Sequence, residues 1–177
     1  PTMSQELRVP YGADTGWQAV RLPYAGSELG MLVVVPDAGE FDEIAGRLAD
    51  GLLDEVVQRL TPATLRLNLP KFEIRSQIGL VPPLQSLGLE EATSDRADFS
   101  GMTGAKDLFI SDVIHEAWIS ADEAGTEAAA ATAVMMSLTA APLDPIDFSI
   151  DRPFFFVLED VETGSILFMG RVVDPGA

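Results

Sequence analysis

The side chains that could perform covalent catalysis are few in this chain of 177 residues. The sequence contains a single histidine, His115, and no cysteine, so it lacks the soft ligands that a zinc site needs. A Ser-His-Asp triad would also depend on His115. That residue lies inside an apolar strand pattern, where a hydrogen-bonded core histidine is the expected role. We therefore predict no catalytic site, no metal and no cofactor.

Small residues at alternate positions form a different kind of functional pattern between Glu123 and Pro142. Alanine is the best helix former, so a plain helix is one interpretation of this stretch. Gly125, however, marks a bend directly after a predicted strand, and the residues beyond it are small or β-branched at every second position: Thr126, Ala128, Ala130, Thr132 and Val134. Such a series could enter a sheet between two strands without clashing with the packed core below.

The remaining residues of this stretch are compatible with that inserted state. No proline lies between Gly125 and Ala141. The only charge there is Glu127, which would lie on the opposite, solvent-facing side of an inserted strand. The pattern therefore predicts a two-state element, which is helical or loop-like when free and a strand when inserted.

The charge balance excludes several classes of partner. The chain carries 28 acidic and 11 basic residues, which gives a formal net charge of −17. Nucleic-acid binding needs lysine and arginine to neutralise phosphates, so neither a nucleic acid nor an anionic membrane surface is an expected partner. An acidic, solvated surface explains the charge, and steering toward a basic partner is the alternative. No apolar run approaches the length of a membrane span.

The segment that follows Glu123 resembles the hinge and reactive loop of inhibitory serpins, in which a glutamate, a glycine and a threonine precede an alanine-rich run. Further stretches are similar to serpin signatures in the same order: Leu69–Phe72, Leu87–Leu89, Ala97–Met102, Ile110–His115, Asp151–Phe156 and Thr163–Val172. The resemblance covers nearly the whole chain. Two departures are Pro82-Pro83, which is unusual before a short leucine-containing helix, and Glu116, where a lysine is common in the family.

The resemblance implies that residues 1–177 are the C-terminal part of a single serpin domain, with a reactive loop over about residues 124–145. A serpin is longer than this chain, so the N-terminal half of the same protein is absent here and is implied as a partner. The matching histidine of the family is a structural hydrogen-bonding residue near the opening of the sheet. That role would make His115 structural, with its partner in the absent half.

The same resemblance implies an irreversible protease inhibitor, not an enzyme. A target serine protease, or a cysteine protease, would cleave the loop and be held as a covalent acyl-enzyme while the hinge inserts into the central β-sheet. The hinge residues implied by the family motif are Glu123, Gly125, Thr126, Glu127, Ala128, Ala129, Ala130, Ala131 and Thr132.

Family spacing counted from Glu123 places the cleaved bond between Thr139 and Ala140, with Leu138 or Met136 as alternative positions. The pair Leu138-Thr139 suits a protease with a small primary pocket, so an elastase-like or chymotrypsin-like target is expected. No lysine or arginine occurs between residues 124 and 151, which excludes a trypsin-like target.

Two other functions stay open on the sequence alone. A non-inhibitory serpin would act as a carrier or chaperone, although such members break the hinge pattern with bulky or charged residues. The second alternative is an independent β-rich interaction module with a flexible alanine-rich arm. The lack of cysteine fits a cytosolic protein or a disulfide-free secreted one. An extracellular location is slightly favoured over a cytoplasmic one, with any targeting segment outside this chain.

The elements that must position the segment are predicted from periodicity. Apolar patterns predict strands over residues 17–23, 29–35, 65–69, 71–75, 108–121, 154–159 and 166–173. Helical spacing predicts two short helices over 41–60, interrupted at Asp50-Gly51, and another over 82–88, whereas 95–106 is expected to be a loop. The predicted fold class is α+β, mostly antiparallel β with short helices, as in the C-terminal half of the serpin fold.

Two kinds of conspicuous side chain are interpreted as structural. Trp17 and Trp118 occupy predicted strand positions and are expected to be packing residues. The acidic pairs Glu90-Glu91 and Glu159-Asp160 lie in turn-like contexts. Both pairs are therefore expected to lie on the solvent-exposed surface.

Overall fold

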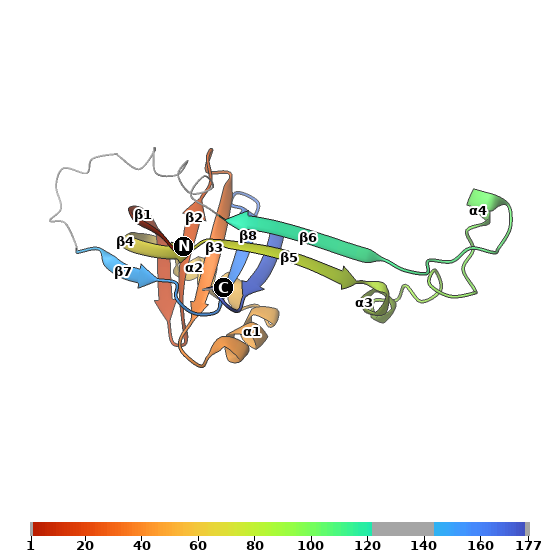
Figure 1. Ribbon diagram of the computed structural model, residues 1–177, viewed down its shortest axis with the longest axis horizontal. Coiled ribbons are helices and arrows are strands. Elements are labelled where there is room, and N and C mark those ends of the chain that lie inside the picture. Colours follow the sequence, from red (N-terminus) through yellow and green to blue (C-terminus); the bar gives the residue numbers. More distant parts are fainter. Residues whose placement is uncertain (1, 122–143, 176–177) are drawn as a thin grey trace. The chain divides into compact units, whose positions relative to one another are not determined.

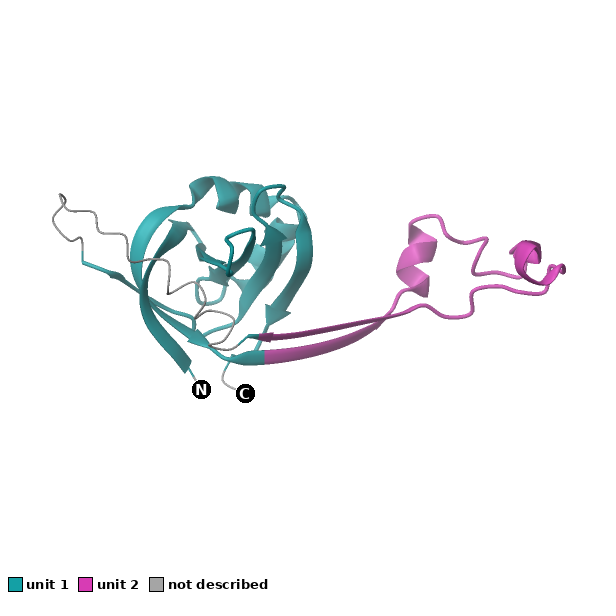
Figure 2. Ribbon diagram, turned by 90° about the horizontal axis from the view of Figure 1, so that it is seen from above, with its two compact units in different colours: residues 1–72, 121–177 teal, residues 73–120 magenta. Residues whose placement is uncertain are grey.

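The computed structural model describes residues 2–121 and 144–175 of the chain. It divides into two compact units, which are coloured separately in Figure 2. The first unit contains residues 1–72 and 121–177, and the second contains residues 73–120. The described elements are mostly β-strands with a few short helices, which confirms the predicted fold class.

A seven-stranded sheet forms the first unit (Figure 1). All neighbouring strands are antiparallel except β4 and β7, which are parallel. Four predicted strands, over 17–23, 29–35, 154–159 and 166–173, are confirmed to within one residue, whereas periodicity did not predict β1 and β7. In spatial order the strands are β7 (Ile146–Ser149), β4 (Thr61–Pro70), β1 (Thr2–Asp14), β2 (Trp17–Pro23), β3 (Leu29–Pro36), β8 (Phe154–Asp160) and β9 (Ile166–Val172).

Two short helices, α1 (Phe41–Ala49) and α2 (Leu52–Arg59), pack on one face of this sheet. The break between them comes at Gly51, whose backbone φ of 100° lies in the left-handed region that glycine adopts readily. Ile44 of α1 packs in one cluster with Trp17, and both side chains are fully buried. The predicted helix pair and the packing role of Trp17 are therefore confirmed.

Aromatic rings fill the other face of the sheet. Phe154 and Phe156 alternate along β8 with the side chains that face the helices, so they point to the opposite side. The ring centroid of Phe72 lies 5.5 Å from the centroids of both rings. Gly170 of β9 pairs with Phe156 and leaves room for its ring, since a Cβ added at Gly170 would lie 2.5 Å from Cζ of Phe156.

Gly170→Ala is expected to lower the free energy of unfolding by about 1–3 kcal/mol, because the Phe156 ring must leave its packed position. Gly46→Ala is the matched control, since a Cβ added at this helical glycine meets nothing within 4 Å. The control is expected to raise stability by about 0.5–1 kcal/mol. Chemical denaturation measures both variants, and equal stabilities would contradict the close contact at Gly170.

One ion pair in the first unit is buried. Arg21 Nε donates to Oε1 of Glu159 at 2.7 Å, and the two side chains are 17% and 5% exposed. Gly30 of β3 lies beside this pair, since a Cβ added there would be 3.3 Å from Cγ of Arg21. The expectation that Glu159 lies on a solvated surface is wrong. Strand alternation places it on the same covered face of β8 as Val157.

The second unit contains most of a two-stranded sheet formed by β5 (Phe72–Gly79) and β6 (Ile114–Ala121), shown in magenta in Figure 2. Helices α3 (Val81–Ser86) and α4 (Ser100–Thr103) come between these strands in the chain. Pro82 and Pro83 stand in the first turn of α3, where proline removes no helical hydrogen bond. None of the helices in the described parts of the chain is long and apolar enough to span a membrane.

Two predicted boundaries in the second unit are wrong. The strand expected over 108–121 begins only at Ile114, because the N–H of Ile110 is bonded to the carbonyl oxygen of Ala92 at 2.9 Å, outside any strand ladder. The stretch 95–106, expected to be a loop, contains the four-residue helix α4.

Candidate functional site: the strands that flank residues 122–143

The predicted reactive segment lies between β6 and β7, and the structure does not describe residues 122–143. The two strands that flank it in the chain are described, β6 on its N-terminal side and β7 on its C-terminal side. The residues predicted from the family motif that lie outside the described parts are the hinge, Glu123, Gly125, Thr126, Glu127, Ala128, Ala129, Ala130, Ala131 and Thr132, and the bond residues Met136, Leu138, Thr139 and Ala140.

Strand β7 anchors the C-terminal side of the segment. It pairs in parallel with β4, with Phe148 opposite Leu67 and Ser149 opposite Asn68. Phe148 is 2% exposed, and its ring packs edge-on against that of Tyr11 with centroids 5.6 Å apart. The amide of Asn68 donates to Oγ of Ser149 at 2.9 Å. A buried ring and a side-chain bond thus fix this end to the sheet of the first unit.

Strand β6 leads into the N-terminal side of the segment. Its only sheet partner among the described residues is β5, so its other edge carries no described strand. Along β6 the side chains of Ala117, Ile119 and Ala121 are partly buried, whereas Glu116 and Trp118 are exposed. The strand therefore has one more apolar face and one more polar face.

Three side chains on the polar face of the β5–β6 sheet contact one another. Nε1 of Trp118 donates to Oε1 of Glu73 at 3.0 Å, and Nε of Arg75 donates to the same oxygen at 3.2 Å. The guanidinium carbon of Arg75 lies 6.0 Å from the ring centroid of Trp118. The Trp118 and Arg75 hydrogen bonds lower the pKa of the Glu73 carboxyl below its usual value, so this group is ionised at neutral pH.

Two expectations about β6 residues are wrong for the described structure. The strand pattern placed His115 in a core and made Trp118 a packing residue, whereas the structural role that the resemblance implies for His115, with a partner in the N-terminal half, stays a prediction. Both are exposed, Trp118 by 56% of its surface. The indole is held by a hydrogen bond and a cation–π contact instead of by packing.

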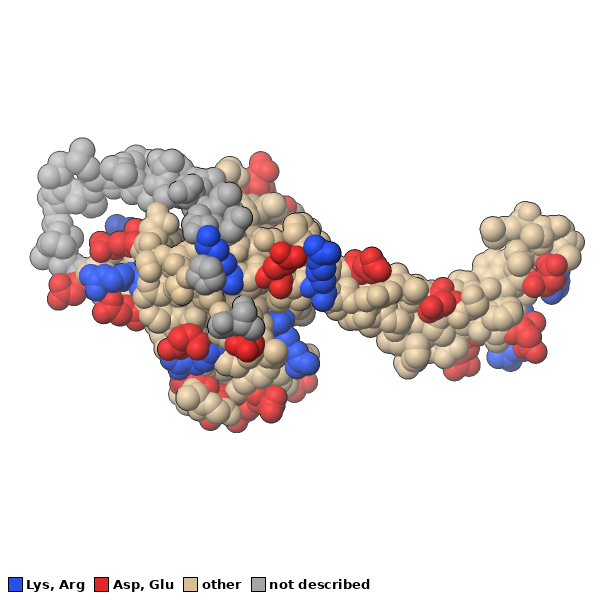
Figure 3. Space-filling model, viewed as in Figure 1, with Lys and Arg blue, Asp and Glu red and all other residues tan. Residues whose placement is uncertain are grey.

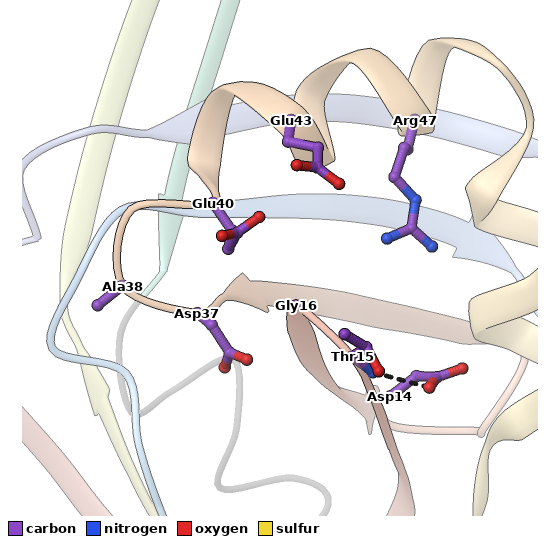
Figure 4. Close-up of a pocket in the computed structure, with 8 residues that line it drawn as sticks. All are labelled: Asp14, Thr15, Gly16, Asp37, Ala38, Glu40, Glu43 and Arg47. Atoms are coloured by element: carbon purple, nitrogen blue, oxygen red, sulfur yellow. Dashed lines mark hydrogen bonds between the residues drawn. The ribbon is translucent and has the colours of Figure 1, made fainter.

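A polar hollow lies at the turn between β1 and β2 and the start of α1 (Figure 4). Its carboxylates are accompanied by Arg47, and Asp14 is paired with Arg59 at 2.6 Å. Within residues 2–121 and 144–175, no three histidine, cysteine or acidic residues are grouped so as to hold a metal ion. The residues that line the hollow are Asp14, Thr15, Gly16, Asp37, Ala38, Glu40, Glu43 and Arg47.

Charged side chains of both signs are intermixed on the face of the first unit shown in Figure 3. Arg66 and Asp147 pair at 2.7 Å across β4 and β7, where both side chains are more than half exposed. Such exposed pairs add little to stability. The excess of acidic residues is thus accommodated on a solvated surface with local ion pairs, and the carboxylates of the polar hollow belong to that surface.

Comparison with known proteins gives consistent matches over the whole chain. A family model described as serpin (serine protease inhibitor) matches residues 1–175. An uncharacterized serpin-like protein of Thermococcus kodakarensis is 39% identical over 178 residues, covering 99% of this chain and 41% of that protein. The leukocyte elastase inhibitor of Bos taurus is 37% identical over 183 residues, covering 98% of this chain and 48% of the inhibitor. The chain spans about half the length of these curated relatives.

Comparison with solved structures supports the same family. The solved structure of thyroxine-binding globulin in complex with thyroxine is similar to 100% of this chain and to 47% of that chain. The TM-score is 0.81 and the sequence identity 27%. The similarity again covers this chain completely and about half of its relative.

Proposed function

Because this chain belongs to the serpin family, we propose that it is the reactive, C-terminal part of a protease inhibitor with an irreversible suicide-substrate mechanism. The observation that carries the proposal is the unbroken series of small and β-branched residues at alternate positions from Thr126 to Val134. In the chain these residues come shortly after β6, which ends at Ala121 and has no described partner on one edge. A strand that enters beside β6 needs side chains of this kind on its buried face.

The free energy for the mechanism comes from a strand that is added after cleavage. Before cleavage the loop is exposed, and its backbone groups bond to water. Cleavage frees one end, and the segment from Thr126 onward pairs with the open edge of β6, forming ladder hydrogen bonds and burying apolar surface. A protease that is still joined as an acyl-enzyme is carried along and distorted before deacylation.

We assign the cleaved bond to Thr139–Ala140, with Leu138 or Met136 as alternatives for the residue before the bond. The target is a serine protease of elastase-like or chymotrypsin-like preference, since Leu138 and Thr139 are uncharged and of small to medium size. The absence of lysine and arginine from 124 to 151 supports the exclusion of a trypsin-like target. Serine and cysteine proteases share the acyl intermediate on which the trap depends.

An N-terminal half of the same protein completes the proposed serpin domain, of which residues 1–177 are the C-terminal part. The support is apolar surface that stands exposed in each unit. In the first unit, Leu167, Phe168 and Met169 of the edge strand β9 are 50%, 44% and 57% exposed. In the second unit, Ile114 is 56% exposed. A contiguous apolar surface on a strand edge is a position where further chain is expected to pack.

A carrier function is the second candidate, because the solved structure with a TM-score of 0.81 is a globulin bound to thyroxine. The hinge sequence favours inhibition, because a carrier does not need a segment that can insert into a sheet. The hinge has no charged residue at the alternate small positions from Thr126 to Val134, so these side chains could be buried by insertion.

The experiment that separates the two candidates mixes the full-length protein with an elastase-type, a chymotrypsin-type and a trypsin-type serine protease. An inhibitor gives a complex with the first or second enzyme that survives denaturant, and the peptide released from it begins at Ala140. A carrier gives no such complex with any of the three. A complex with the trypsin-type enzyme alone would overturn the assigned bond and target class.

A further inference from the structure

Glu73, Arg75 and Trp118, hereafter the clasp, contact one another close to the point where β6 leads into residues 122–143. It joins the two strands of the β5–β6 sheet, because Glu73 and Arg75 belong to β5 and Trp118 belongs to β6. Trp118 stands three positions before Ala121, the residue after which the described part of β6 ends. The clasp therefore joins β6 to β5 near the end of β6, on the N-terminal side of the hinge.

Stability alone does not account for this arrangement. The side chains of Arg75 and Glu73 are 78% and 54% exposed, and Trp118 is 56% exposed. Exposed ion pairs contribute little to the free energy of folding. Glu116 and Ser120, the neighbours of Trp118 on that face of β6, are exposed too, so packing among the described residues does not hold the ring in place.

The geometry is better suited to fixing a position. One carboxylate oxygen of Glu73 accepts both the indole N–H and the Arg75 Nε–H, at 3.0 and 3.2 Å. The guanidinium carbon of Arg75 lies 6.0 Å from the centre of the same indole. The three groups form a closed triangle, so the indole cannot slide along β5 without breaking a hydrogen bond.

We infer that Trp118, Glu73 and Arg75 are positioning residues for inhibition: they hold the end of β6 on β5, so that the open edge of β6 is in place when the hinge inserts. The inference rests on the proposed inhibitory function. Insertion competes with hydrolysis of the acyl-enzyme, so slower insertion sends more molecules into cleaved, inactive product. Loss of the clasp should therefore change that partition and leave the folded state almost as stable as before.

The test compares two neutralising substitutions in the full-length protein, Glu73→Gln and Asp98→Asn. Asp98 is a matched control in the same unit, since its exposed carboxylate also accepts from a basic side chain, Lys106 Nζ at 2.6 Å, and from Ser100 Oγ at 2.6 Å. The readout is the number of inhibitor molecules consumed per protease inactivated, measured beside the midpoint of thermal unfolding.

Glu73→Gln and Trp118→Phe are each expected to raise the number of inhibitor molecules consumed by about two- to fivefold, the range that an exposed ion pair or cation–π contact supplies. The double variant should be no worse than either single one, because both act on the same indole–carboxylate hydrogen bond: Glu73→Gln removes the charge of the acceptor and Trp118→Phe removes the donor. Asp98→Asn should leave the consumption unchanged, and all unfolding midpoints should stay close together.

Three results would overturn the inference. If Glu73→Gln and Trp118→Phe consume no more inhibitor than the unaltered protein, the clasp does not position β6, although the proposed function stands. If the rise simply follows a lower unfolding midpoint in every variant, the clasp is structural only. If the unaltered protein forms no covalent complex with any protease, the proposed function fails and the inference fails with it.

Discussion

Ala128→Glu is expected to turn the protein from an inhibitor into a substrate. In the inserted strand, Ala128 belongs to the alternate series that faces the packed interior, and an unpaired buried carboxylate is strongly unfavourable. Insertion then becomes slower than deacylation, and the protease is released active. The yield of denaturant-resistant complex should fall about tenfold or more, the factor that about 1.4 kcal/mol of added barrier produces.

Ala129→Glu is the matched control, because it adds the same charge one position further on. Its side chain lies on the solvent-facing side of an inserted strand, beside Glu127, and should leave most of the complex intact. Thr126→Glu should behave like Ala128→Glu. Equal complex yields from the two alanine variants would contradict insertion of this segment as a strand.

Arg21→Met is expected to have the largest effect on stability. It removes the only basic side chain bonded to Glu159 among the described contacts, and Glu159 is 4% exposed. Breaking a buried pair by removing one partner costs about 3–5 kcal/mol, because the remaining charge stays desolvated. Equilibrium unfolding in urea measures the loss.

The double variant Arg21→Met with Glu159→Leu supplies the control for that prediction. It replaces both charges with apolar side chains of similar size, and buried ion pairs replaced in this way lose little or no stability. The double variant should therefore be clearly more stable than Arg21→Met. A double variant as unstable as the single one would show that packing around Arg21, and not its charge, carries the effect.

The sequence predicted the elements whose apolar pattern is strong. The apolar run of β3 has the length of a strand, is rich in valine and ends at Pro36, and α1 and α2 show helical spacing on either side of a break at Gly51. Strand β1 was missed, although the apolar residues Leu7, Val9 and Tyr11 lie at alternate positions along it. Its many polar residues and Pro10 concealed that signal, because proline is read as a strand breaker.

Side-chain roles were harder to predict than strands. The sequence placed Trp17 and Trp118 in the same class, yet the first is fully buried and the second is 56% exposed. What separates them is tertiary: Trp17 lies under α1, whereas Trp118 meets Glu73, a residue distant in the chain. Glu159 was misassigned for the same reason, since its partner Arg21 lies on another strand. Period-2 alternation along β8 could have indicated its burial.

Thermal unfolding before and after cleavage of the loop tests the central claim, insertion of the hinge, most directly. The full-length protein is nicked with a metalloprotease, which forms no acyl intermediate and cannot be trapped, and mass spectrometry locates the cut between Val134 and Ala141. Insertion adds a hydrogen-bonded strand beside β6, so the midpoint of the cleaved protein should rise well above that of the intact protein. An unchanged or lower midpoint after cleavage within that range would contradict insertion.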